Sequence, residues 1–178
     1  MFALNENVVY PGYGVARVSR ILERVIGLQV THFYELKFLH KDMTILVPVD
    51  NLVVVGVRAL SGHCCVASVF KMFEDSTQGN LESDVGTSSW NKRNKRYQAS
   101  LRKGDLLEIS KVYCDLQCLS QIKDLSFGER ALLVQTETLL AEEIAIIEQS
   151  AFDQVVIQLR SFFVHGYIAP HKEPVQAI

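Results

Sequence analysis

The sequence lacks the long apolar run that a membrane-spanning helix requires. No stretch approaches the roughly 20 consecutive apolar residues needed to cross a bilayer, and the opening residues, MFALNEN, have neither the basic start nor the apolar middle of a signal peptide. We therefore expect a soluble, cytoplasmic protein with no membrane partner. Because 48% of the 178 residues are hydrophobic, the chain has enough apolar material for a folded core, and dominant disorder is excluded.

Cysteine is scarce, and its spacing fits neither a disulfide framework nor a zinc site. Two of the four cysteines, Cys64 and Cys65, are adjacent, while Cys114 and Cys118 lie four residues apart in a segment with helical periodicity. The second spacing permits two metal ligands, but no further Cys or His pair follows at zinc-finger distance. We expect Cys114 and Cys118 to be small buried side chains, and we expect no metal and no cofactor.

Sequence motifs of catalysis are also missing. The chain has no Gly-rich phosphate loop and no nucleophile elbow, so we expect that the protein is not an enzyme. One enzymatic alternative stays open, a thiol-dependent enzyme in which the imidazole of His63 activates the neighbouring Cys64. This alternative lacks an evident oxyanion site and a third group that would orient the imidazole.

Charge is unevenly distributed along the chain. The net charge is −2, from 18 basic and 20 acidic residues, but residues 90–103 contain six basic residues and no acidic one. That segment is therefore +6 and the remainder of the chain is −8. The balanced total hides a basic patch on an acidic body. The six basic residues are Lys92, Arg93, Lys95, Arg96, Arg102 and Lys103.

The first 58 residues have the pattern of a small β-barrel. Segments rich in β-branched and aromatic residues predict strands at residues 8–10, 15–26, 31–39 and 44–49. Because a flat sheet of this size would leave two edges and little core, we expect closure into a barrel. Pro48 cannot donate a ladder hydrogen bond, so residues 43–49 are a candidate exposed edge that accepts a strand from a partner. A following helix that covers this edge is the alternative.

After Gly56 the pattern changes from strand-like to helical. Apolar spacings of three and four predict helices at residues 62–74, 90–102, from 106 onward, 127–148 and 152–163. Asp105 and Ser126 are each followed three residues later by Glu, which predicts two capping boxes. The buried face of the longest helix is expected to carry Ala131, Leu132, Leu139, Leu140, Ile144 and Ile147.

Together these patterns predict an α+β protein with two domains. A small β-barrel at residues 1–58 is followed by an all-α helical bundle at residues 61–165, whose own apolar faces form a second core. The polar, aperiodic residues 75–89 are expected to be a loop within the helical domain, and residues 166–178 a flexible tail. Since each half can satisfy its own apolar faces, we expect a monomer.

The only tryptophan, Trp90, is predicted in the first turn of the basic helix at residues 90–102. A lone tryptophan is usually part of a core, and a basic helix face is usually solvated, so that interpretation stays open. The combination also fits DNA binding, because basic side chains contact phosphates while a flat indole stacks on a base or wedges into a minor groove. Six basic residues on an acidic protein are too few for tight autonomous binding, so we expect DNA contact only while another protein holds this one in place.

Residues in both halves match the motifs of one known family. In the first half they are VVYPGYGV at 8–15, RVIG at 24–27, YEL at 34–36, VPVDN at 47–51 and VGVR at 55–58. In the second half they are Trp90, Lys92, Arg93, Gly104, Asp105, Val112, Asp115, Leu116, Leu125, Ser126, Gly128, Glu129, Leu132, Leu133 and Glu143. With these residues the chain resembles, from residue 2 to about residue 150, the bacterial CarD/CdnL transcriptional regulators, whose N-terminal module is shared with transcription-repair coupling factor.

The resemblance implies a Tudor-like barrel that docks on the β subunit of RNA polymerase. It implies that the strand with Thr44, Ile45, Leu46 and Val47 adds to a polymerase sheet, and Arg24 resembles a polymerase-contacting arginine of the family. It further implies that the helical domain reaches promoter DNA at the upstream edge of the transcription bubble. There Trp90 would wedge into the minor groove, with Lys92, Arg93 and Lys95 as a backbone clamp and Arg96 beside them as a further candidate DNA contact.

Leu46 departs from the family pattern, because some members carry a polymerase-contacting arginine at this position and a leucine cannot pair with a carboxylate. Docking through this strand is therefore expected to be more apolar, or weaker. The leading hypothesis is a transcription regulator that binds the polymerase β subunit and stabilises the open promoter complex. The alternative is a polymerase-binding adapter without direct DNA contact, in which residues 90–103 are a solvated surface.

Overall fold

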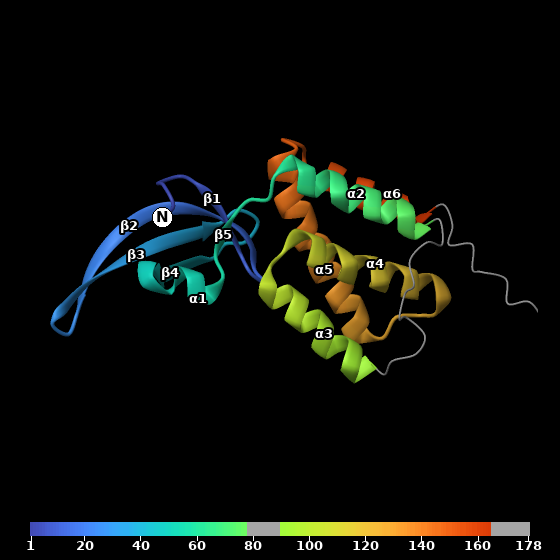
Figure 1. Ribbon diagram of the computed structural model, residues 1–178, viewed down its shortest axis with the longest axis horizontal. Coiled ribbons are helices and arrows are strands. Elements are labelled where there is room, and N and C mark those ends of the chain that lie inside the picture. Colours follow the sequence, from blue (N-terminus) through green and yellow to red (C-terminus); the bar gives the residue numbers. More distant parts are fainter. Residues whose placement is uncertain (78–89, 165–178) are drawn as a thin grey trace, which may run out of the picture.

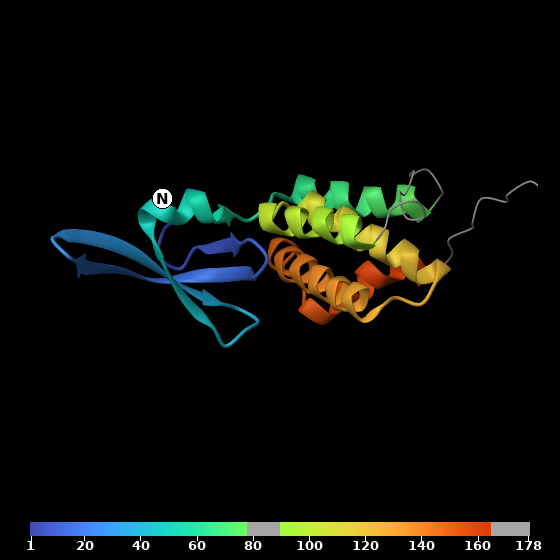
Figure 2. The same cartoon turned by 90° about the horizontal axis from the view of Figure 1, so that it is seen from below.

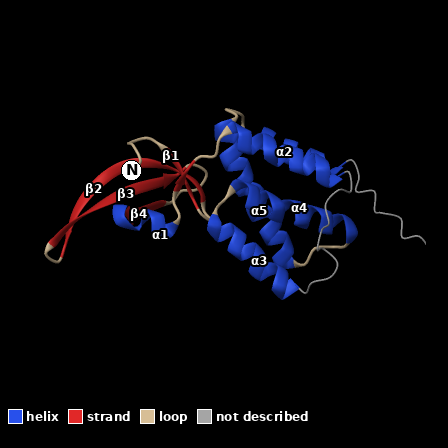
Figure 3. Ribbon diagram, in the orientation of Figure 1, coloured by secondary structure: helices blue, strands red, loops and turns tan. Residues whose placement is uncertain are grey.

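A β-sheet and a group of helices lie side by side along the long axis of the molecule (Figure 1). The computed structural model describes residues 1–77 and 90–164. The first part of the chain forms the sheet module and the later part forms the helical module, as the colouring by secondary structure makes clear (Figure 3). This arrangement confirms the predicted α+β fold class.

The sheet module is a five-stranded antiparallel sheet with the strand order β4-β3-β2-β1-β5. Its strands are β1 (Asn7–Tyr10), β2 (Gly14–Ile26), β3 (Gln29–Phe38), β4 (Thr44–Pro48) and β5 (Arg58–Ala59). The first four lie where β-branched and aromatic residues predicted strands, whereas the two-residue β5 was not predicted. A bulge between Val18 and Arg20 shifts the register of β2 against β3. The long β2–β3 hairpin projects away from the helices (Figures 1 and 2).

The sheet is curved (Figures 1 and 2), but its two edge strands, β4 and β5, are not paired with each other among the described residues, so strand pairing does not complete the expected closure into a barrel. Between them the chain forms a 3-10 turn η1 (Val49–Asn51) and a short helix α1 (Leu52–Val55). This helix was not predicted, because its sequence LVVV favours a strand. It forms because Leu52 packs into the sheet core with Val8 and Leu36, which covers apolar surface that a closing strand would otherwise cover.

The helical module contains five helices within the described residues. They are α2 (His63–Thr77), α3 (Trp90–Lys103), α4 (Leu106–Ile122), α5 (Phe127–Ile147) and α6 (Phe152–Val164). The loop was expected to begin at residue 75, but α2 continues to Thr77. Ser76 is buried in this last turn, and its hydroxyl donates to the carbonyl of Phe73 at 2.8 Å. The rest of that loop and the tail at 166–178 lie outside the described residues. No helix of residues 1–77 and 90–164 is long and apolar enough to cross a membrane.

Capping residues define where the helices begin and end. Ser126 and Glu129 form the predicted capping box at the start of α5, since each side chain binds the other residue's backbone N–H. The box predicted for α4 is only half formed. Asp105 accepts from the N–H of Glu108, but the Glu108 carboxylate binds Lys111 at 2.8 Å instead of returning to the cap. Gly104, with φ +68°, ends α3 as predicted.

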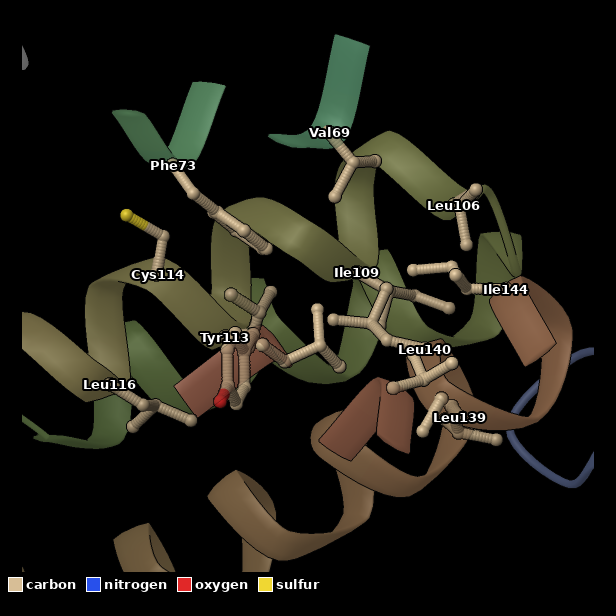
Figure 4. Close-up of a cluster of buried hydrophobic side chains, with 14 of the residues drawn as sticks. Val69, Phe73, Leu106, Ile109, Tyr113, Cys114, Leu116, Leu139, Leu140 and Ile144 are labelled. Atoms are coloured by element: carbon tan, nitrogen blue, oxygen red, sulfur yellow. The ribbon is translucent and has the colours of Figure 1, made fainter. Parts of the chain in front are cut away.

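Residues from all five helices form the second core. Phe73 of α2, Tyr113 of α4 and Leu140 of α5 pack together in its centre (Figure 4). Cys114 and Cys118 are buried in the same cluster, as expected for small apolar side chains. The prediction for Ala131 was wrong, because this residue is exposed on the opposite face of α5. The error arose because an alanine on an apolar helix gives little indication of which face it occupies.

The C-terminal part of α5 joins the two modules through Glu143. Its carboxylate accepts hydrogen bonds from both terminal nitrogens of Arg58 in β5, each at 2.8 Å, and from the backbone N–H of Ser61 at 2.9 Å. The same guanidinium donates to the carbonyl of Gly104 at the end of α3. Arg58 therefore links the sheet, α3 and α5 in one network.

Glu142 makes a second link between α5 and the sheet. One carboxylate oxygen accepts the backbone N–H of Val15 at 3.1 Å, and burial raises the pKa of this carboxyl. The preceding residue, Gly14, has φ +108°, and a Cβ atom there would overlap Oε2 of Glu142. The positive φ favours glycine at this position, and any larger residue would also displace the Glu142 carboxylate.

Replacing Glu143 by Gln is expected to lower the free energy of unfolding by about 3 kcal/mol, because Arg58 would lose its carboxylate in a mostly buried site. Urea denaturation followed by circular dichroism measures this change. Glu148→Gln is the matched control, since its contact with His63 at 3.0 Å is exposed and should contribute less than about 0.5 kcal/mol. Equal losses in the two variants would contradict this account of the junction.

Candidate functional site

The outer face of the sheet presents a group of basic side chains. Directly opposite residues in antiparallel strands share a face, and the register aligns Arg17 with Lys37 and Arg20 with Glu35. Arg17, Arg20 and Arg24 of β2 and Lys37 of β3 are all exposed, and the alternation of side chains in the two strands, with the bulge between Val18 and Arg20, places them on the side away from the core. The sequence analysis identified only Arg24 of this set. The other three depend on the strand register and on the bulge in β2, which the sequence alone does not specify.

Strand β4 forms one edge of the sheet, with only β3 paired to it among the described strands. Thr44 is exposed, Ile45 and Leu46 are half-buried, and Val47 is buried. Ile45 and Val47 pack on the sheet core, so their side chains support the module. Leu46 lies opposite Glu35 on the basic outer face. The candidate residues of β4 thus divide between the two faces of the sheet, while its outer backbone edge is shared by all of them.

Leu22, Phe33 and Pro48 lie opposite one another across β2, β3 and β4. Arg24 lies two residues further along β2. It is therefore beyond the end of β4, in the projecting part of the β2–β3 hairpin. The end of this hairpin is unusually apolar for an exposed segment. Its exposed hydrophobic residues are Val25, Ile26, Leu28 and Val30.

Trp90 begins α3 and rests on the first turn of α5. Its indole is half-buried and packs on the helical core, and a Cβ atom built on Gly128 would lie 3.2 Å from Cζ2 of the ring. Phe127, the residue before Gly128, is 90% exposed. It lines a shallow apolar depression with Arg130, Ala131 and Val134. The indole is thus supported on one side by the protein and is neither fully enclosed nor fully free.

The basic side chains of α3 are not equivalent. Lys92 and Lys95 are exposed. Arg96 is also exposed, but its guanidinium is 3.2 Å from the carboxylate of Asp115 and lies over the ring of Tyr97. Of the expected DNA contacts on this helix, Lys92 and Lys95 therefore have the most accessible charges.

Arg93 was expected to be exposed, but it is buried, with only 7% of its surface exposed. It lies on the buried stripe of α3 with Tyr97 and Leu101, at a spacing of four residues. Its Nη2 donates to Oε1 of Glu129 at 2.9 Å. Tyr97 and Leu101, four and eight positions after Arg93, are the signal in the sequence that could have indicated this orientation.

The carboxylate of Glu129, at the start of α5, accepts hydrogen bonds from several donors. Besides Arg93, it accepts from Lys123 at 3.3 Å and from the backbone N–H of Ser126 at 2.9 Å. Burial raises the pKa of this carboxyl, but the bonds with Ser126, Lys123 and Arg93 lower it more, to about 2. Glu129 is thus ionised at neutral pH although it is 1% exposed.

The remaining polar groups give little support for catalysis. Nδ1 of His63 lies 3.0 Å from Glu148, which is a carboxylate that the sequence analysis did not identify as a partner. However, consecutive positions on a helix do not face each other, so His63 is poorly placed to activate Cys64. A hydrogen bond with Cys118 raises the pKa of the Cys114 thiol, which disfavours its thiolate. Within the described residues no group of three or more His, Cys, Asp or Glu side chains could hold a metal ion.

Comparisons with known proteins assign both modules. A family model described as "CarD-like/TRCF RID domain" matches residues 2–61, and one described as "CarD, C-terminal domain" matches residues 69–159. A protein of Bacillus subtilis (strain 168) with the name "Putative transcription factor YdeB" is 21% identical over 148 residues, which are 83% of this chain and 93% of the relative.

A sheet module of the first kind joined to a helical module of the second kind defines a class of transcription regulators rather than of enzymes. Since the match to the helical module covers just over half of the residues, the chain belongs to the CarD family. That match ends at residue 159, so it includes part of α6, beyond the limit of about residue 150 that the sequence motifs indicated.

The low pKa of Glu129 predicts how its contribution to stability depends on pH. The folded-state pKa of about 2 lies below the ordinary 4.5, so the stabilisation is present above about pH 4.5 and is lost as the pH falls toward 2. Glu129→Gln should lower the free energy of unfolding by about 3 kcal/mol at pH 7, since each pKa unit corresponds to about 1.4 kcal/mol. Urea denaturation at pH 7, 4 and 2.5 measures the difference, and a difference that does not shrink with acid would disprove this assignment.

Proposed function

We propose that this chain is a transcription regulator that binds the β subunit of RNA polymerase through its sheet module and stabilises the open promoter complex through α3. The observation that carries the proposal is the position of Trp90, half-buried on Gly128 with the exposed charges of Lys92 and Lys95 nearby on α3. An aromatic ring that is supported behind and accessible in front is suited to stacking against a base or a groove wall.

The sheet module is the proposed polymerase-binding part. Its outer face combines the exposed cations Arg17, Arg20, Arg24 and Lys37 with the half-buried Leu46. Such a face fits an acidic partner surface with an apolar centre, because charge complementarity guides encounter and apolar contact adds affinity. The free edge of β4 can in addition accept a strand from the partner.

The helical module is the proposed DNA-contacting part. Lys92 and Lys95 would contact phosphates at the upstream edge of the bubble, and Trp90 would occupy the minor groove there. A group that fits melted DNA better than intact duplex shifts the equilibrium toward the open complex by its difference in affinity. A single stacked aromatic contributes about 1–3 kcal/mol, which is enough for roughly a fivefold to a hundredfold shift.

The links through Glu142 and Glu143 support the joint action of the two modules. Because α5 is bonded to both the sheet and the first turn of α3, docking of the sheet would also orient Trp90. DNA contact then takes place within a complex that is already assembled, so a small basic patch suffices.

A second candidate function is an adapter that binds polymerase without touching DNA. It is favoured by the packing of Trp90 on Gly128 and by the internal bond of Arg93, both of which use potential DNA contacts within the protein. Crosslinking from residue 90 in a polymerase–promoter complex distinguishes the two. A crosslink to DNA at the bubble edge supports the regulator, and its absence supports the adapter.

Replacing Trp90 by Ala is expected to shorten the lifetime of the open complex about fivefold or more, because the ring that engages the opened step is removed. The lifetime is measured by the decay of promoter complexes after addition of a competitor. Polymerase binding should be unchanged in a pull-down with the same variant. An unaltered lifetime at saturating protein would rule out the wedge.

Arg24→Glu should weaken the interaction with RNA polymerase about tenfold, since it places a like charge against an acidic partner surface. A pull-down or titration with polymerase core enzyme at low and moderate salt measures the change, which should be larger at low salt. Lys71→Glu, an equal charge reversal at an exposed position of α2, is the matched control and should bind normally. Equal weakening by both variants would indicate a general charge effect and refute the assigned face.

A further inference from the structure

Trp90 and Arg93 lie one turn apart at the start of α3, and both contact the first turn of α5. The indole lies over Gly128, and the guanidinium binds the next residue, Glu129. The first turns of α3 and α5 lie at the same end of the helical module in both views of the chain (Figures 1 and 2). The support for the ring and the ion pair are therefore parts of one contact between two helices.

Glu129 is itself held firmly in place. Its carboxylate accepts from the N–H of Ser126 at 2.9 Å, and its own N–H donates to the hydroxyl of Ser126 at 3.3 Å. These bonds fix the carboxylate relative to the first turn of α5. A guanidinium bound to it is consequently fixed relative to Gly128 as well.

The burial of the pair opposes a direct role of Arg93 on DNA. The side chains of Arg93 and Glu129 are 7% and 2% exposed. If Arg93 turned outward to a phosphate, Glu129 would lose its closest cation while remaining buried, and breaking such a pair is strongly unfavourable. Exposed Lys92 and Lys95 can reach phosphates without any such loss.

We propose that the Arg93–Glu129 pair is a positioning device for Trp90, and that Arg93 supports DNA binding without neutralising a phosphate. This inference rests on the proposed function. The pair fixes the first turn of α3 against α5, so that the indole keeps one accessible face instead of adopting many orientations. Preorganisation of this kind increases affinity by reducing the conformational entropy lost on binding.

The single tryptophan allows the first test on the chain without DNA or polymerase. Arg93→Met and Glu129→Gln should raise the acrylamide quenching constant of the indole fluorescence and shift its emission to longer wavelength. Arg93→Lys keeps the charge and should restore part of the native signal. Circular dichroism establishes that each variant is folded.

Two matched controls separate positioning from general effects. Lys92→Met removes a neighbouring exposed charge, and Glu137→Gln removes another buried carboxylate of α5, which binds Arg160 and Tyr113 instead. Both should leave quenching of Trp90 unchanged. Unchanged quenching in Arg93→Met and Glu129→Gln, or an equal change in Glu137→Gln, would overturn the proposal.

The second test measures the affinity of the chain for a preformed polymerase–promoter complex over a series of salt concentrations. The slope of log K against log salt is negative, and each phosphate contact that is lost lowers its magnitude by about 0.9. Lys92→Met should lower the magnitude of this slope. Arg93→Met should reduce affinity about fivefold or more with the slope unchanged, and Trp90→Ala with Arg93→Met should bind no more weakly than Trp90→Ala alone.

The outcomes for Arg93 and for the proposed function can be distinguished. A salt slope of smaller magnitude in Arg93→Met, or a loss of affinity that adds to that of Trp90→Ala, would show a phosphate contact and overturn the positioning role while leaving the regulator intact. If Trp90→Ala alone does not change affinity or open-complex lifetime, the proposed function itself fails, and the positioning role for DNA fails with it.

Discussion

Helix α5 carries four buried carboxylates, and each accepts a hydrogen bond from a different part of the fold. Glu129 binds Arg93 of α3, Glu137 binds Tyr113 of α4 and Arg160 of α6, Glu142 binds the backbone of β2, and Glu143 binds Arg58 of β5. Because a buried polar or charged group that loses its partner is costly, movement of any of these elements away from α5 would lower stability. The helix therefore fixes the sheet and α3 relative to each other.

This constraint unites two surfaces that have little in common chemically. The outer face of the sheet is broad and basic around Leu46, and the start of α3 is a small site around one indole ring. Neither is large or charged enough to explain tight binding alone. Under the proposed function, they become effective when one molecule presents both surfaces to an assembly of polymerase and promoter, since the first contact then supplies the second at high local concentration.

Local features of the fold were predictable from sequence, and long-range ones were not. The β-branched strands, Gly104 at the end of α3 and the Ser126–Glu129 box depend on neighbouring residues, and all were found. Helix α1 forms against local preference because Leu52 fills the sheet core. The basic row on the sheet depends on register and on the bulge at Val18–Arg20. Arg93 was placed on the surface because a cation was assumed to seek water, whereas its partner lies 36 residues away.

The absence of a side chain at Gly14 has a consequence for how far the protein reaches. The carboxylate of Glu142 occupies the space that a Cβ atom would need at Gly14, and it accepts the N–H of Val15, so β2 is held directly against α5. Under the proposed function, the distance between the polymerase contact and the DNA contact is set at this junction. A larger residue at Gly14 would then move the position at which the indole meets the duplex, in addition to weakening the contact.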